Sequence, residues 1–195
     1  GHNSIEEVIQ YAKQRGYQFI GITDHSGSLQ VAGGLTGQEL KEQIEEIRKV
    51  SKRIQGITVF AGSEVDIKQD GKMDFPDELL NQLDIVIASI HIGFKKDEKV
   101  NTQRMITAIR NPFVTIVAHP TGRLLGERDP YALNIDEVMK AAKETGTAME
   151  INSAYKRLDL NDVHTRKARD MGLILSIDTD SHHTDQFWQM ELGIG

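Results

Sequence analysis

The sequence predicts an α/β fold in which a parallel sheet closes, or nearly closes, into a β/α barrel. Six short runs of β-branched and apolar residues alternate with helix-like segments along the chain. That alternation is typical of parallel strands joined by right-handed helical crossovers. Most of the runs are almost wholly apolar and stop abruptly at an ionisable side chain, as buried strands of parallel barrels do. A barrel therefore fits the pattern better than an open, doubly wound sheet.

The expected strand at 173–177 shows this design most clearly. It runs into Asp178, and Asp180 and His182 follow two residues apart, so extended backbone would point these two side chains the same way. The other expected strands have a similar composition and span residues 17–23, 57–62, 84–90, 113–118 and 147–151. No G-x-G-x-x-G or G-x-x-x-x-G-K-S/T motif follows any of them, which removes the usual nucleotide-binding folds.

Helical periodicity and capping residues predict the connecting segments. Ser4-x-x-Glu7 is a capping box at the start of the first helix, and Leu40, Ile44 and Ile47 give the second helix one apolar face. Glycine, proline or asparagine residues bound most of the others. Helices are expected at residues 4–15, 37–54, 75–83, 100–110, 135–145 and 161–171, and a glycine-rich loop at 27–36.

Length and composition limit the possible functions. At 195 residues the chain is expected to form one domain, residues 1–195. No apolar run approaches the roughly 18 residues of a membrane span and no export signal is visible, so the cytoplasm is the expected location. The absence of cysteine leaves only nitrogen and oxygen as metal ligands. The net charge of −6 argues against a generic nucleic-acid binder without excluding one, because divalent cations can attract phosphate.

Ionisable side chains of the kinds that bind metals follow every expected strand. In a parallel barrel the carboxyl ends of the strands meet at one rim, so these side chains are expected to converge. Any one of them alone is explained as simply by packing or capping, and only their recurrence at strand after strand favours a metal site. The residues are Asp24, His25, Glu64, Asp66, His91, His119, Glu150, Asp178, Asp180 and His182.

The mixture of imidazoles and carboxylates suits Zn²⁺, Mn²⁺ or Fe²⁺ better than Ca²⁺ or Mg²⁺. More candidates are present than one tetrahedral ion needs, so a cluster of two or more ions is expected. The commonest task of such clusters is hydrolysis at phosphorus with a metal-activated hydroxide. Arg123, Lys156 and Arg157 lie just after two of the strands and are candidates to contact a substrate phosphate, ordinary surface charge being the alternative.

Five motifs together resemble the PHP (polymerase and histidinol phosphatase) family. They are Ile22-Thr23-Asp24-His25-Ser26, Gly62-Ser63-Glu64-Val65-Asp66-Ile67, Ala88-Ser89-Ile90-His91, Ala118-His119-Pro120-Thr121-Gly122-Arg123 and Ile177-Asp178-Thr179-Asp180-Ser181-His182. The fourth motif and Arg157-Leu158-Asp159-Leu160 are most similar to the C-terminal PHP domain of bacterial family X DNA polymerases. The resemblance covers essentially the whole chain.

This resemblance implies a distorted seven-stranded β/α barrel with a site for up to three divalent metals, usually manganese or zinc. Carried over to this sequence, the metal ligands are His25, Glu64, His91, His119, Asp180 and His182. Four further carboxylates occupy family positions without being expected ligands, and we expect them to orient the imidazoles. These are Asp24, Asp66, Glu150 and Asp178.

One part of the family pattern is missing from this sequence. The family begins with a strand that carries His-x-His, followed by an Asp directly before a glycine that aligns with Gly1. We therefore expect six parallel strands in place of seven, in a chain trimmed at both ends, with a polymerase domain upstream in the parent protein. Weak or partial metal loading is also expected, because the missing histidines would bind at least one ion.

Three functions are compatible with these observations. The first is a metal-dependent phosphoesterase that acts as a 3′–5′ exonuclease or processes DNA 3′ ends within a family X DNA polymerase. The second is a stand-alone phosphatase for a small phosphomonoester such as histidinol phosphate, with loop 27–34 and Arg123 shaping a small pocket. The third is a non-catalytic scaffold, which the six retained ligand candidates argue against.

Overall fold

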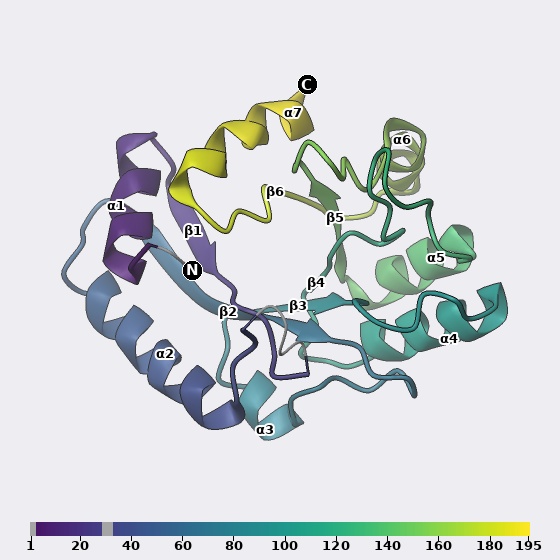
Figure 1. The fold of residues 1–195 in the computed structure, drawn as a ribbon, viewed down its shortest axis with the longest axis horizontal. Coiled ribbons are helices and arrows are strands. Elements are labelled where there is room, and N and C mark those ends of the chain that lie inside the picture. Colours follow the sequence, from purple (N-terminus) through teal and green to yellow (C-terminus); the bar gives the residue numbers. More distant parts are fainter. Residues whose placement is uncertain (1–2, 29–32) are drawn as a thin grey trace.

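The sheet of this protein is a single curled layer of parallel strands. The computed structural model describes residues 3–28 and 33–195. Six strands follow one another in the order β1-β2-β3-β4-β5-β6, and helices pack on the outer surface of the curl (Figure 1). This confirms the predicted fold class, a β/α barrel with six parallel strands. Residues 29–32 of the predicted glycine-rich loop lie outside the described part of the chain.

Strands and helices alternate as the sequence predicts. The strands are β1 (Phe19–Ile22), β2 (Thr58–Asp66), β3 (Ile85–Ser89), β4 (Ile116–Val117), β5 (Ala148–Asn152) and β6 (Leu175–Asp178). The helices are α1 (Ile5–Gln14), α2 (Gly37–Ser51), α3 (Asp77–Leu80), α4 (Glu98–Ile109), α5 (Ile135–Thr145), α6 (Asp162–Met171), the 3₁₀ helix Thr184–Gln189 and α7 (Met190–Ile194).

The largest departure from the prediction is the length of β2. This strand continues to Asp66 because residues 62–66 pair in parallel with residues 85–89 of β3. Glu64 and Asp66 therefore lie within a strand and not after one, and its two-residue period places both side chains on the same face. Helix α3 is shorter than expected, and the helical segment 184–194 has no counterpart in the prediction.

Local sequence explains where the helices begin and end. In the capping box of α1, the Ser4 hydroxyl accepts the Glu7 N–H while the Glu7 carboxylate accepts the Ser4 N–H. Helices α5 and α6 end at Gly146 and Gly172, which adopt left-handed φ angles of 77° and 74°. Among the described residues no helix is both long enough and apolar enough to cross a bilayer.

The apolar faces of the outer helices form a core with the sheet. The largest side chains that are fully buried come from five helices, from the strands they cover and from the residue after β2, and burial of each contributes about 1.5–3 kcal/mol. On the helices they are Ile9, Leu40, Ile47, Leu80, Met105, Ile109 and Met139. This core fixes the strands against one another and so determines where their carboxyl ends lie.

The C-terminal segment occupies the opening between the two edge strands (Figure 1). The ring of Phe187 makes edge-on contacts with Tyr11 of α1 and with Tyr17, at centroid distances of 5.5 and 6.1 Å. Helix α7 packs on β6 at the other side of the opening. Segment 184–194 thus joins the first helix to the last strand.

The backbone of β2 at Gly62 packs tightly against its neighbours, and a substitution there tests this packing. A methyl group at this position would lie 2.7 Å from the Ile85 carbonyl oxygen and 2.9 Å from Thr23 Cγ2. We expect Gly62→Ala to lower the free energy of unfolding by about 2 kcal/mol through overpacking. Gly21→Ala, whose methyl would meet its nearest neighbour at 3.4 Å, is the control and should change it by less than about 1 kcal/mol. Equal denaturant midpoints for the two variants would contradict this packing.

Candidate metal centre

The buried carboxylate of Glu64 is the centre of a histidine cluster. Three imidazoles surround it: His119 Nε2 lies 2.9 Å from Oε1, His91 Nε2 lies 3.3 Å from Oε1, and His25 Nδ1 lies 3.1 Å from Oε2. Glu64 is 7% exposed. The structure therefore brings together four of the six expected ligands, each from the end of a different strand.

Strand pairing explains how residues distant in sequence meet here. The backbone after β1 runs beside β2, where Ser26 N–H donates to the Glu64 carbonyl at 2.9 Å and Glu64 N–H donates to the Asp24 carbonyl at 3.0 Å. His91 and His119 follow β3 and β4, the next two strands in the sheet. The parallel order thus delivers the imidazoles to one end of the sheet, as the sequence predicts.

His91 is oriented by a carboxylate behind it. Its Nδ1 lies 2.8 Å from Asp66 Oδ1 and 3.2 Å from the Ser89 hydroxyl, which leaves Nε2 directed at Glu64. The other Asp66 oxygen accepts the Ser28 hydroxyl at 2.7 Å. Carboxylates placed in this way fix the tautomer and the direction of a metal-binding imidazole.

His119 is held by its backbone. Its φ of 28° lies in the left-handed region, which is sparsely populated by residues other than glycine. The His119 N–H donates to the buried carboxylate of Glu150, and the His119 carbonyl accepts the Gly122 N–H at 2.9 Å. Strained backbone of this kind clusters at functional sites.

Asp180 and His182 lie at the edge of the cluster. The His182 ring centroid is 5.9 Å from that of His25, and its Nδ1 lies 3.0 Å from the Asp180 carbonyl. The Asp180 carboxylate accepts Asn152 Nδ2 at 3.1 Å and pairs with Arg157 Nε at 3.3 Å. His182 is exposed, in contrast to the four central residues.

Charge within the cluster is concentrated on Glu64 and His91. Burial alone would raise the pKa of the Glu64 carboxyl, but its contacts with His119 and His91 outweigh burial and hold this pKa well below its ordinary value. Burial likewise opposes the charge on His91, yet Asp66 and Glu64 raise its pKa to about 9. Burial lowers the pKa of His25. An ionised carboxylate therefore stands between imidazoles that a cation would recruit as ligands.

Glu150 and Asp178 form a second buried acidic pair behind His119. Burial and the neighbouring Asp178 raise the pKa of Glu150 well above its ordinary value. Burial also raises the pKa of Asp178 to about 6. Two carboxyl groups this close share a proton more readily than they ionise together.

The remaining expected site residues lie further from the cluster. The Asp24 carboxylate accepts Gln43 Nε2 of α2 at 2.7 Å, so it faces a helix and not an imidazole. Arg123 donates from Nε to the Arg157 carbonyl at 2.9 Å and from Nη2 to the Leu158 carbonyl. Lys156 forms an exposed ion pair with Glu127. The contacts of Arg123 and Lys156 fasten the loop after β5 to the loop after β4.

Arg157 lies beside Asp180 at the edge of the cluster. Its Nε pairs with Asp180, while its Nη1 is buried and donates to no group among the described residues. Asp159, which sequence analysis did not single out, accepts the Thr121 N–H from within the same loop system and is fully buried. Only its place in the Arg157-Leu158-Asp159-Leu160 motif hinted at this role.

The donor set fits a divalent metal. Ligand atoms of His25, Glu64 and His91 all lie within 4.8 Å of one another. His25 Nδ1 is buried and makes no hydrogen bond within the described part of the chain, although a carboxylate oxygen is only 3.1 Å away. A buried ring nitrogen without a hydrogen bond is costly unless another partner accepts its lone pair, and imidazole with carboxylate suits zinc or manganese.

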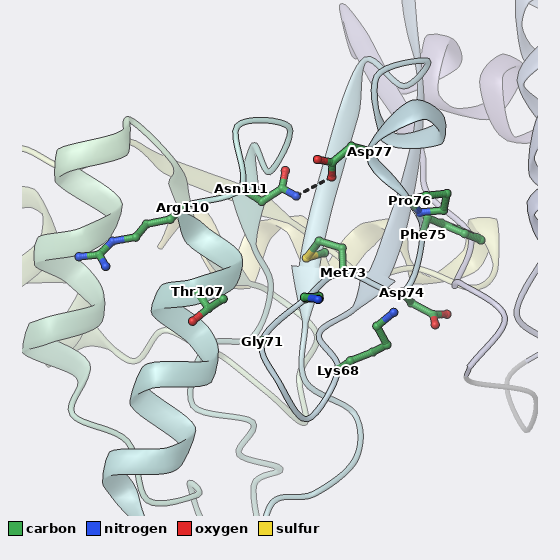
Figure 2. A pocket seen from close by; sticks show the side chains of 11 residues that line it. Lys68, Gly71, Met73, Asp74, Phe75, Pro76, Asp77, Thr107, Arg110 and Asn111 are labelled. Atoms are coloured by element: carbon green, nitrogen blue, oxygen red, sulfur yellow. Dashed lines mark hydrogen bonds between the residues drawn. The ribbon is translucent and has the colours of Figure 1, made fainter.

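A surface pocket lies away from this cluster. A surface pocket of about 530 Å³ opens between the segment after β2 and the end of α4 (Figure 2). Asn111 donates to Asp77 at 2.9 Å across one side of it. None of the expected metal ligands lines it. The candidate chemistry therefore belongs to the strand ends and not to this pocket.

Comparison with known proteins agrees with this geometry. The family model of the PHP domain matches residues 1–154. The chain belongs to the PHP domain family. PHP proteins are metal-dependent hydrolases, and the expectation drawn from the five motifs is confirmed.

Relatives of this PHP domain include both polymerases and phosphatases. It is 42% identical over 194 residues to the DNA polymerase/3′-5′ exonuclease PolX of Bacillus subtilis (strain 168), a match that covers 100% of the chain and 34% of PolX. It is 32% identical over 191 residues to a probable phosphatase of Thermoanaerobacter sp. (strain X514), covering 93% of the chain and 73% of that protein. The chain thus spans about a third of the length of PolX.

A solved structure shows the same fold. Histidinol phosphate phosphatase from Lactococcus lactis, in complex with zinc, L-histidinol and phosphate, superposes with a TM-score of 0.66 at 16% identity. The match covers 99% of this chain and 86% of that protein. At this level of identity the comparison supports the barrel architecture.

Manganese should stabilise this PHP domain through the cluster. When the concentration of free ligand is a hundred times its Kd, binding adds about 2.7 kcal/mol to the free energy of unfolding. We expect Mn²⁺ to raise the melting temperature of the wild type in a concentration-dependent way and to do so little or not at all for His91→Ala. His164→Gln, on α6, is the control and should respond like the wild type. The same Mn²⁺ response in His91→Ala would contradict the assignment.

Proposed function

We propose that this chain is the metal-dependent phosphoesterase domain of a family X DNA polymerase and hydrolyses phosphodiester bonds at DNA 3′ ends. The observation that carries this proposal is the 42% identity to PolX, which extends over the whole chain. The match covers a third of PolX, so a polymerase domain in the same protein is part of the proposal.

We assign the metal-binding role to the cluster around Glu64 and to the two residues at its edge. A divalent cation held there, Mn²⁺ or Zn²⁺, supplies Lewis acidity for hydrolysis at phosphorus. The donors outnumber the ligands of one tetrahedral ion, which supports a site for more than one ion, with fewer expected than the three of the intact family site. The proposed ligands are His25, Glu64, His91, His119, Asp180 and His182.

Three carboxylates support these ligands. Asp66 fixes the direction of the His91 ring, and Glu150 holds the strained backbone of His119. Asp178 lies beside Glu150 and raises its pKa. Asp24, bonded to α2, fastens the end of β1 to the outer layer. The contacts of Asp66, Glu150 and Asp178 support a role in orienting the ligands and not in binding substrate.

Arg157 is the residue we assign to the substrate phosphate. It lies beside Asp180 and keeps one buried nitrogen with no hydrogen-bond acceptor in residues 3–28 and 33–195, and guanidinium binds phosphate oxygens in a planar, two-point manner. The side-chain contacts of Arg123 and Lys156 give them an indirect part, because they hold the loop that carries Arg157.

A second candidate function is hydrolysis of a small phosphomonoester. The relatives described as probable phosphatases, one of which the chain matches over 73% of its length, favour it. The histidinol phosphate phosphatase neighbour has the same fold. Both reactions use the same kind of site, so only the substrate distinguishes them.

The two candidates are separated by a paired assay with Mn²⁺. Single-stranded DNA labelled at its 5′ end and bearing a 3′ hydroxyl is compared with L-histidinol phosphate. We expect a ladder of shortened DNA and little phosphate release, with Glu64→Gln lowering the rate at least a hundredfold by removing the central ionised carboxylate. Phosphate release without DNA shortening would replace the proposal with the second candidate. Bound Mn²⁺ without either reaction would favour a scaffold.

A further inference from the structure

Arg104 on α4 is buried, and among the described residues its guanidinium donates only to backbone carbonyls. The residue is 3% exposed. Its Nε donates to the Lys68 carbonyl at 2.8 Å, its Nη1 donates to the Ile92 carbonyl at 2.8 Å, and its Nη2 donates to the Ile67 carbonyl. The guanidinium thus connects the outer helix to two separate loops at the carboxyl end of the sheet.

No carboxylate forms an ion pair with Arg104 in the part of the chain that the structure describes. Its hydrogen bonds go to backbone carbonyls, and burial lowers the pKa of its guanidinium although Tyr131 and Asp66 act in the opposite direction. A buried cation without an acidic partner is costly, and an apolar side chain would fill the same space without that cost. The fixed fork of five N–H groups is suited to joining several carbonyls at once. We therefore look for the role of Arg104 in the two loops whose carbonyls it joins.

The loops that Arg104 joins carry two residues of the metal centre. Ile67 and Lys68 come directly after Asp66, and Ile92 comes directly after His91. Asp66 Oδ1 and His91 Nδ1 are 2.8 Å apart, and this contact directs the opposite ring nitrogen at Glu64. One guanidinium therefore sets the spacing of the two backbones from which the pair extends.

The two loops pack closely against Arg104, so neither can shift far relative to it. A methyl group at Gly93 would lie 3.2 Å from Arg104 Nη1, and one at Gly71 would lie 2.9 Å from the Arg104 carbonyl oxygen. Both loops approach the arginine at glycines, so their backbones contact it directly. A shift of the guanidinium would move both loops.

We propose that Arg104 is a positioning residue of the metal centre, which holds Asp66 and His91 in register so that the imidazole faces Glu64. The proposal rests on the assignment of His91 as a metal ligand. It goes beyond that assignment because Arg104 lies on an outer helix and touches neither a ligand side chain nor substrate. Loss of such supporting contacts typically weakens metal binding about 10- to 100-fold.

The experiment compares Arg104→Ala and Arg104→Lys with Arg110→Ala, an exposed arginine at the end of the same helix for which the structure shows no side-chain hydrogen bond or ion pair. Mn²⁺ affinity is measured on folded protein from the loss of the electron paramagnetic resonance signal of aqueous Mn²⁺. We expect Arg104→Ala to bind at least about tenfold more weakly and Arg104→Lys to be intermediate. Arg110→Ala should match the wild type, and millimolar guanidinium should partly restore binding to Arg104→Ala.

A purely structural role would give a different result. Arg104→Ala would then melt at a lower temperature while its folded form bound Mn²⁺ with wild-type affinity, and this outcome would overturn the proposal. Should Arg104→Ala fail to fold, Arg104→Lys keeps the charge and the length of the side chain and provides the test.

A second readout does not depend on metal. In the metal-free protein, the His91 Nδ1 proton shared with Asp66 should give a slowly exchanging nuclear magnetic resonance signal that Arg104→Lys weakens and Arg110→Ala preserves. If the wild type binds no Mn²⁺, the proposed function fails, and this signal still decides whether Arg104 positions the pair. An unchanged signal in Arg104→Lys would refute the positioning role.

Discussion

The contact between one buried carboxylate and three imidazoles is the constraint on which this structure depends. Removing an ion from water costs several kcal/mol, and Glu64 is tolerated at 7% exposure because His91 and His119 replace its hydration, with the His25 ring 3.1 Å from its second oxygen. Each imidazole follows a different strand, so the charge is compensated only where the ends of neighbouring strands converge. The site therefore assembles only if the sheet curls so that these strand ends meet. The apolar packing of the outer helices holds the strands in that arrangement.

Backbone strain is part of the same arrangement. His119 and Asp180, with φ of 28° and 48°, occupy a region that costs about 1–3 kcal/mol for a residue other than glycine. Fixed partners hold both: Glu150 accepts the His119 N–H, and Asn152 with Arg157 holds the Asp180 carboxylate. Several arginine side chains near the site donate to backbone carbonyls, so few of the described cationic groups are available to bind an anion. The site is therefore rigid and acidic. It favours a metal cation, and phosphate would bind more readily once that cation is present.

The sequence predicts the alternation of strands and helices and the convergence of residues at the strand ends, because burial on both faces and the period of each element leave a clear pattern. It misses the extension of β2 through Glu64 and Asp66, since polar residues at a strand end resemble a loop. It also misses Arg104 and Ser28. An arginine on an amphipathic helix has the same signature whether it faces water or three backbone carbonyls, and only the fold shows which. The direction of Asp24 toward α2 is likewise set by tertiary packing.

The direct measurement of the central claim is the X-ray absorption spectrum of the zinc-loaded protein at the zinc edge. If the imidazoles around Glu64 bind metal, the spectrum shows nitrogen and oxygen ligands at about 2.0–2.1 Å and the multiple scattering of at least two imidazole rings, and this scattering decreases in His91→Ala. A spectrum with oxygen ligands alone, or one that His91→Ala leaves unchanged, would contradict the account.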